Sequence, residues 1–306
     1  MNLFCVLLIV FVLTEYSKTV VSQIIDGIAV ENIKDYNYIV GIQYHRSDGA
    51  DFYNCIGTII NSYKIVTAAH CLFNNTPSFT LIFGSQKLTE PVYTVNITDL
   101  DYTIHPKYSR GSPYLNDIGV IELKKALPFG EHIGKIDMVD KKMIEKEYAG
   151  HTDEEVTMLG YTTSEHPKRT PSYSPLMSVV SKIADFAECK RTYRKRKQNC
   201  VLDFERQFCV ALRGPHHNMH LSNAGDSGGP VILKLWTKSS KPSIKHFFLG
   251  FTSNDIRGLP EICTKVAGHL DFIANPKAFV AKYNKKQNAA SKSKSKFKFS
   301  KCIPSM

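Results

Sequence analysis

Short apolar runs separated by turn residues follow one another from residue 24 to about residue 266. β-Branched and aromatic residues dominate these runs, and their spacing is close to that of antiparallel barrels and sandwiches. The pattern therefore predicts an all-β domain built from many short strands. The predicted strands are 38–44, 56–60, 62–68, 80–83, 91–97, 118–123, 156–159, 230–235 and 246–253.

Helical periodicity is confined to the C-terminal end of the chain. The apolar positions in 270–273 and 279–283 can share one face of a terminal helix that ends near Tyr283. Pro276 interrupts this pattern, so the helix is expected in two short pieces. The lysine- and serine-rich tail 284–306 is predicted to be a disordered extension.

The N-terminus carries an apolar run, MNLFCVLLIVFVL, that is too short to span a bilayer. Such a run is typical of the core of a secretory signal peptide, and Val20 and Ser22 offer small residues for cleavage before Gln23. A buried N-terminal strand or helix is the alternative, but the run shows no polar face. We therefore predict a signal peptide at residues 1–22 and a secreted, extracellular protein.

Cysteine usage supports the same compartment. Seven cysteines remain once Cys5 leaves with the signal peptide, and disulfides persist after secretion but are rare in the cytosol. The odd count leaves at least one thiol free or paired between chains. Two sequons, at Asn74 and Asn96, are candidate glycosylation sites on a secretory route.

Much of the net charge of +11 lies in the C-terminal tail and in the segment 190–197, KRTYRKRK. A basic tail can hold a protein to an anionic surface by simple attraction and by counterion release. A solvated extension without a partner is the alternative. We predict no specific nucleic-acid partner, and we expect a monomer.

Three motifs carry the residues of a nucleophilic site. An apolar strand delivers His70 at its end, an aspartate, Asp117, opens another apolar strand, and a glycine-rich turn holds Ser227. Each motif alone has an ordinary structural explanation: a surface histidine, a strand-capping acid or a glycine turn. Together they resemble the trypsin/chymotrypsin family of serine proteases in residue type, order and approximate spacing. The motifs are IVTAAHC at 65–71, NDIGVI at 116–121 and GDSGGP at 225–230.

The resemblance covers residues 24–283 and implies a fold. The family fold has two antiparallel six-stranded β-barrels and a C-terminal helix, with the catalytic groups in the cleft between the barrels. We expect the first barrel at about 24–138 and the second at about 139–274.

The resemblance also implies a mechanism. His70 takes the proton from Ser227 and later gives it to the leaving amine, while Asp117 fixes the tautomer of His70. Ser227 forms an acyl-enzyme, and the amides of Gly225 and Ser227 point at the developing oxyanion. This chemistry is that of a serine endopeptidase acting on protein substrates, with protein protease inhibitors as further partners and with no metal or cofactor.

The start of the family-like region resembles a mature N-terminus, Ile24-Ile25-Asp26-Gly27. In the family, the freed ammonium pairs with the acid before the nucleophile, which is Asp226 here. Gln23, not Arg or Lys, precedes Ile24, so either another protease removes this overhang or the chain stays zymogen-like. A non-catalytic or zymogen-locked homologue that binds or regulates partners is therefore an alternative, and a basic tail as the main functional element is another.

The resemblance implies two disulfides, Cys55–Cys71 beside the catalytic histidine and Cys189–Cys209 in a loop bordering the substrate pocket. Two other family bridges are absent as pairs: Val156 and Leu233 occupy both ends of one, and Asn223 occupies one end of the other. The cysteines without an assignable partner are Cys200, Cys263 and Cys302, with Cys200–Cys302 as one candidate pair.

The resemblance leaves the specificity open. The residue at the floor of the family's pocket is Leu221, where trypsin-like members carry aspartate, and Asp255 and Glu261 stand at wall positions. An acid in the wall could pair with a basic substrate side chain, or could block the pocket. A preference for apolar or aromatic residues and a solvent-facing Glu261 are the other possibilities. Ser253 resembles the family serine that supports the triad aspartate.

Overall fold

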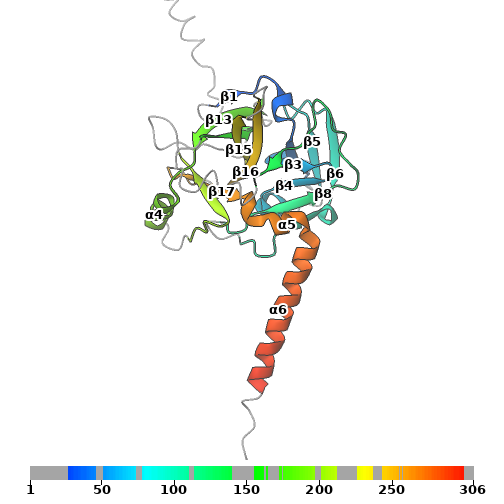
Figure 1. Ribbon diagram of the computed structural model, residues 1–306. Coiled ribbons are helices and arrows are strands. Elements are labelled where there is room, and N and C mark those ends of the chain that lie inside the picture. Colours follow the sequence, from blue (N-terminus) through cyan, green and yellow to red (C-terminus); the bar gives the residue numbers. More distant parts are fainter. Residues whose placement is uncertain are drawn as a thin grey trace, which may run out of the picture.

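The computed structural model describes residues 27–45, 51–73, 78–109, 114–139, 155–161, 163–164, 172–173, 175–196, 201–211, 226–236, 243–254, 256 and 258–299. Their strands form two largely antiparallel sheets, one in each half of the molecule, with the terminal helix projecting from the body (Figure 1). The predicted all-β fold with a C-terminal helix is therefore confirmed. The proposed signal peptide lies outside the described residues.

The first half contains a seven-stranded sheet in the order β6-β5-β2-β3-β4-β8-β7. The β3–β4 hairpin turns at Asn61, whose side-chain oxygen accepts a hydrogen bond from the Tyr63 amide at 2.8 Å. Because this turn takes up residues 62 and 63, the strand predicted at 62–68 begins two residues later, at Lys64, and is shorter. The strands are β2 (Ile39–His45), β3 (Asp51–Asn61), β4 (Lys64–Thr67), β5 (Phe79–Phe83), β6 (Tyr93–Ile97), β7 (Tyr102–Ile104) and β8 (Gly119–Glu122).

The second half contains an eight-stranded sheet in the order β1-β13-β10-β15-β16-β17-β14, with β9 pairing in parallel with β16. A separate hairpin joins β11 (Thr163–Ser164) to β12 (Ser172–Tyr173). The sheet's strands are β1 (Ile28–Ala29), β9 (Asp137–Met138), β10 (Glu155–Gly160), β13 (Met177–Lys182), β14 (Gln207–Val210), β15 (Pro230–Trp236), β16 (Ile244–Asn254) and β17 (Glu261–Lys265).

The boundary between the halves differs from the expected one at both ends of the first barrel. β1 and β9 fall within the 24–138 segment, yet both pair with strands of the second sheet. The amide of Val30 continues the β1 pairing by donating to the Leu176 carbonyl at 2.8 Å, and the Val30 side chain is buried. The N-terminal end of the chain therefore pairs with the second sheet before the strands of the first sheet begin. Short additional strands give the two sheets seven and eight strands, where six each were expected.

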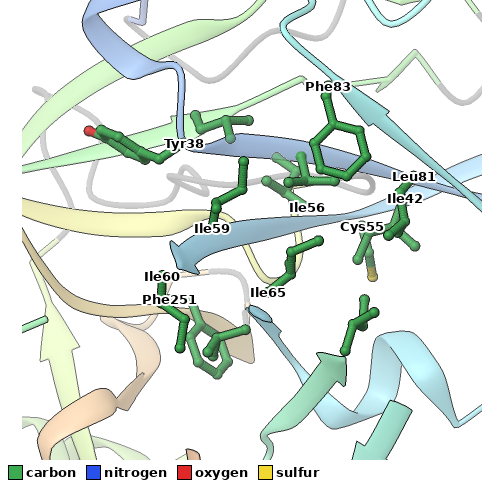
Figure 2. Packing of buried hydrophobic residues seen from close by; sticks show 14 of the residues in the cluster. Tyr38, Ile42, Cys55, Ile56, Ile59, Ile60, Ile65, Leu81, Phe83 and Phe251 are labelled. Atoms are coloured by element: carbon green, nitrogen blue, oxygen red, sulfur yellow. The ribbon is translucent and has the colours of Figure 1, made fainter. Parts of the chain in front are cut away.

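One hydrophobic core runs from the first sheet into the second half. Figure 2 shows part of it, in which Phe251 of β16 lies with Ile60 of β3 and Ile65 of β4. Phe251 is fully buried, and the same core includes Ile232 of β15 and Phe272 near the C-terminus. A second, smaller core lies within the second sheet and includes Val156 and Leu233, the residues that replace one family bridge.

Helices are few until the C-terminus. They are η1 (Ile33–Tyr36), α2 (Ala69–Leu72), η2 (Asp99–Asp101), α4 (Phe186–Arg196), η3 (Val266–His269), α5 (Leu270–Ala274) and α6 (Pro276–Phe299). The predicted break at Pro276 is confirmed. Asn275 caps α6 by accepting from the Ala278 amide at 3.2 Å, and Pro276 takes the first helical position, where its missing N–H costs nothing.

The extent of the terminal helix corrects the prediction of a disordered tail from residue 284, because α6 continues to Phe299. Alanine, lysine and glutamine favour helix, and no glycine or proline interrupts the chain between residues 277 and 299. None of the helices in the described part of the chain is both long enough and apolar enough to cross a membrane.

Candidate active site

His70 and Asp117 meet because their strands pair. His70 follows the end of β4 in the short helix α2, and Asp117 stands two residues before β8, which pairs with β4 through Thr67 and Gly119. The Nδ1 atom of His70 lies 2.8 Å from Oδ2 of Asp117, and the His70 amide donates to Oδ1 at 2.9 Å. These two bonds orient the imidazole with Nδ1 toward the acid.

The second half completes the surroundings of Asp117. The Ser253 hydroxyl donates to Oδ2 of Asp117 at 2.6 Å, and the Thr264 hydroxyl donates to the Asp117 backbone carbonyl at 3.1 Å. The side chain of Asp117 is 0% exposed, so these hydrogen bonds offset the cost of burying a carboxylate. None of the sequence motifs points to Thr264.

Ser227 sits in a tight turn pressed against β3. The Gly229 amide donates to the Asp226 carbonyl at 2.9 Å, and the Ser227 carbonyl accepts from the Ile56 amide at 2.8 Å. Gly228 has a φ of 78°, and a Cβ there would lie 2.3 Å from the Ile56 carbonyl oxygen. Only glycine fits this position, so the motif's glycine gives the turn its close approach to β3.

The predicted Cys55–Cys71 disulfide is present, and it lies between the Ser227 turn and the segment that carries His70. The Cys71 sulfur is 3.7 Å from the Ser227 carbonyl oxygen, and His70 precedes Cys71 in the chain. A ring nitrogen of His70 and both sulfurs lie within 4.8 Å of one another, which is a spacing that metal ligands can have. The sulfurs are bonded to each other and are not thiolates, so this trio does not form a metal site.

Two aromatic residues form a row beside the imidazole of His70. Tyr114 stacks on the His70 ring with centroids 5.7 Å apart and an interplanar angle of 24°, and Tyr108 lies beyond it at 6.5 Å. Tyr114 has a φ of 52°, a conformation that is strained for a bulky residue and is seen most often at functional sites. Sequence reasoning missed Tyr114, and no motif in the chain marks it.

Glu261 opens β17 and is only 1% exposed. The possibility that this side chain turns to solvent is therefore wrong. Its strand neighbour Cys263 is a buried free thiol, whose pKa is raised by burial and then by the charge of Glu261. Asp226 is also buried. The predicted site residues Ile24, Leu221, Gly225 and Asp255 lie outside the described residues.

The second predicted disulfide, Cys189–Cys209, is also present and ties α4 to β14. β14 in turn pairs with β17, and Val210 lies opposite Glu261. Asn96 is exposed on β6, with its Oδ1 accepting from the Thr80 hydroxyl at 2.7 Å. The other predicted glycosylation site and the candidate disulfide pair, Asn74, Cys200 and Cys302, lie outside the described residues.

Comparisons with known proteins agree with this geometry. The family model described as Trypsin matches residues 24–273. The chain is similar to Serine protease 1 of Drosophila melanogaster, with 25% identity over 77% of this chain and 79% of the relative. It is also similar to Phenoloxidase-activating factor 3 of Holotrichia diomphalia, with 24% identity over 79% of this chain and 69% of the relative. A third relative is Chymotrypsin of Phaedon cochleariae, with 22% identity over 74% of this chain and 73% of the relative.

Proposed function

The chain belongs to the trypsin family of serine proteases, and from that membership and the site geometry we propose that it is an active, secreted serine endopeptidase. The observation that carries the proposal is the environment of Asp117. Its buried carboxylate accepts hydrogen bonds from the backbone amide and Nδ1 of His70 and from the Ser253 hydroxyl, contributed by the two halves of the molecule. Burying a carboxylate lowers the stability of a protein, so its retention here is best explained by its role in orienting the histidine.

The proposed reaction follows from this arrangement. With Nδ1 bonded to Asp117, the Nε2 atom of His70 is the nitrogen left to accept the Ser227 proton. The Ser227 oxygen then bonds to the carbonyl carbon of the scissile amide, His70 passes the proton to the leaving amine, and the carbon–nitrogen bond breaks. Water, activated by the same histidine, hydrolyses the acyl-enzyme and restores Ser227.

We place the oxyanion hole at the amides of Gly225 and Ser227. The constrained turn supports this placement, because Gly228 and Gly229 both bond to neighbouring carbonyls and hold the Ser227 backbone. Activation would follow release of Ile24, whose ammonium would enter the second half and pair with the buried Asp226. Such a buried pair is stable only when both partners are present, so processing before Ile24 would control activity.

Glu261 is our candidate for the specificity-determining acid. Glu261 lies in a strand that would border the pocket, and a carboxylate at that wall would pair with a lysine or arginine side chain of a substrate. Matched fluorogenic peptides that differ only in lysine, phenylalanine or alanine before the scissile bond would test this. A tenfold or greater preference for lysine that Glu261→Gln removes would support it, and a preference for phenylalanine or alanine would refute it.

The activity itself is tested by labelling the secreted protein with a fluorophosphonate probe and sequencing the N-terminus of the same sample. We expect labelling at Ser227 in molecules that begin at Ile24, and none in Ser227→Ala. Absent labelling despite an Ile24 terminus would refute the proposal and favour a non-catalytic homologue. If Gln23 is retained and labelling is absent, trimming with an aminopeptidase that removes glutamine should restore it; failure after trimming would also refute activity.

A further inference from the structure

Helix α4 carries an unusual concentration of positive charge for its length. Its eleven residues, FAECKRTYRKR, include five basic side chains and one acidic one. We propose that α4 is a docking surface for a sulfated polysaccharide chain, separate from the active site and from the basic helix α6. This inference does not depend on catalysis.

Four of the five basic side chains of α4 converge on one face, and Arg196 lies on the other side of the helix. At 100° per residue, the positions 187, 190, 191, 194 and 195 fall within an arc of about 140°. The same five residues line a surface hollow of about 450 Å³. Arg191, Arg194 and Lys195 are exposed, whereas Cys189 and Tyr193 on the opposite side of the helix are fully buried. The charged face is therefore the one that α4 presents to solvent. The helix itself lies at the edge of the molecule (Figure 1).

The helix is fixed to the body, so its charges are held in a defined pattern. The Cys189–Cys209 disulfide ties it to β14, and the Tyr193 hydroxyl donates to the Pro260 carbonyl at 2.8 Å. Phe186 packs against the same small hydrophobic cluster at the start of the helix. A pre-organised surface loses less entropy on binding than a flexible basic tail does.

Helix stability does not account for this charge pattern. Cations in the last turn interact favourably with the helix dipole, which explains Arg194, Lys195 and Arg196. The dipole does not explain Lys190 and Arg191, one turn earlier. The pairs Lys190–Arg194 and Arg191–Lys195 place like charges four residues apart, which destabilises the helix. Glu188 is the one acidic residue of the helix, and its carboxylate lies 3.2 Å from Arg191.

The composition of the face selects among anionic partners. Single-stranded nucleic acids are bound largely through exposed aromatic rings that stack on bases, and an amphipathic membrane anchor carries apolar side chains that insert. Among the described residues, the hollow of α4 is lined by four cations and Ala187, and both aromatic residues of the helix pack against the body. Sulfate groups spaced along a polysaccharide match this purely cationic face, and the arginine guanidiniums suit them through paired hydrogen bonds.

The test uses full-length protein, carrying Ser227→Ala to prevent autolysis, and a defined heparin oligosaccharide. One variant carries Lys190→Gln, Arg194→Gln and Lys195→Gln. A matched control removes the same charge from exposed lysines of the first half through Lys34→Gln, Lys87→Gln and Lys125→Gln. A third variant neutralises α6 through Lys282→Gln, Lys285→Gln and Lys286→Gln. Affinity is measured as a function of salt concentration, and thermal unfolding verifies that each variant is folded.

We expect the α4 variant to bind heparin about tenfold to a hundredfold more weakly near 0.15 M salt, with a salt slope reduced by about two. The control variant should lose far less of its affinity for heparin. Equal losses in the α4 variant and the control would overturn the proposal, because net charge alone would then explain binding. Loss confined to the α6 variant, or equal affinity for single-stranded DNA or anionic vesicles, would overturn it as well.

Discussion

A buried histidine pair beneath the terminal helix should make stability fall on mild acidification. His105 is 5% exposed, and its ring lies 5.5 Å from His269, 5.0 Å from Phe272 and 5.2 Å from Phe279, measured between centroids. Its Nδ1 accepts from the Lys107 amide at 3.2 Å. Burial, and then the charge of His269, lower the pKa of His105 to about 3 from its ordinary 6.5.

The sign and size of the effect follow from proton linkage. Between pH 6.5 and 3 the unfolded chain binds a proton that the folded chain excludes from His105. The stabilisation is therefore fully present above the ordinary pKa and is lost as the pH falls toward the folded value. At about 1.4 kcal/mol per pH unit, acidification from pH 7.5 to 5 should lower the free energy of unfolding by about 2 kcal/mol through His105 alone. The pKa of His269 is also lowered, mainly by burial, so it acts in the same direction.

Urea unfolding at the two pH values measures this loss, in a Ser227→Ala background with disulfides intact. His105→Phe keeps an aromatic ring in the cluster but removes the titrating group. The fall in its free energy of unfolding between pH 7.5 and 5 should therefore be about 2 kcal/mol smaller than that of the parent. Phe272→Leu is the matched control, because it loosens the same cluster at every pH and should keep the parent's pH dependence. If His105→Phe loses as much stability as the parent, the buried histidine is not the cause.

Three further predictions concern the frame around the site. Ser253→Ala removes a hydroxyl that donates to Asp117 at 2.6 Å, and should lower kcat/KM about tenfold to a hundredfold; an unchanged kcat/KM for a peptide substrate would show that this bond is idle. Phe251→Ala should lower the free energy of unfolding by about 3–5 kcal/mol in urea titrations, and a cost below about 1 kcal/mol would contradict its place in the shared core. Replacing Cys189 and Cys209 together by alanine should cost about 2–4 kcal/mol, visible as a lower Tm, and an unchanged Tm would count against a structural role.

The parts of the fold that the sequence predicts best are those marked by a motif or by a sustained apolar run. His70, Asp117 and Ser227 each stand in a short, recognisable context, and the structure brings those contexts together. The strands that were missed include β7, β13, β14 and β17, besides the two-residue strands. β17 is buried along its whole length, yet it contains Glu261 and Lys265, and no alternation of apolar and polar residues marks it as a strand.

The length of the terminal helix depends on whether its lysine- and serine-rich sequence favours disorder or helix. A run of lysines and serines is typical of disordered tails, but the same residues permit helix when a capped segment precedes them. Asn275 and Pro276 supply that start, and the packing of Phe279 against the core holds the first turns in place. Because a break at Pro276 was expected, the proline was taken only as an interruption, although it also opens the longer helix.

Tyr114 could not be predicted because its role arises from backbone geometry. The left-handed conformation of Tyr114 and Asn116 turns the segment before Asp117 so that the tyrosine ring covers His70. Sequence patterns report propensities, and this conformation runs against the propensity of Tyr114, although asparagine adopts it readily. Such departures are informative, since strain of this kind persists only where the surrounding structure holds it.

The site exists only when the two halves of the molecule are joined. The first half supplies His70 and Asp117, while the second supplies Ser227 and the hydroxyls of Ser253 and Thr264 that bond to Asp117. The shared core and the buried carboxylate therefore depend on one another. Separation of the halves would expose apolar surface and leave Asp117 without two of its donors, so loosening of the interface should abolish activity before either sheet unfolds. The geometry of the site is thus a property of the packing between halves, which the motifs alone do not encode.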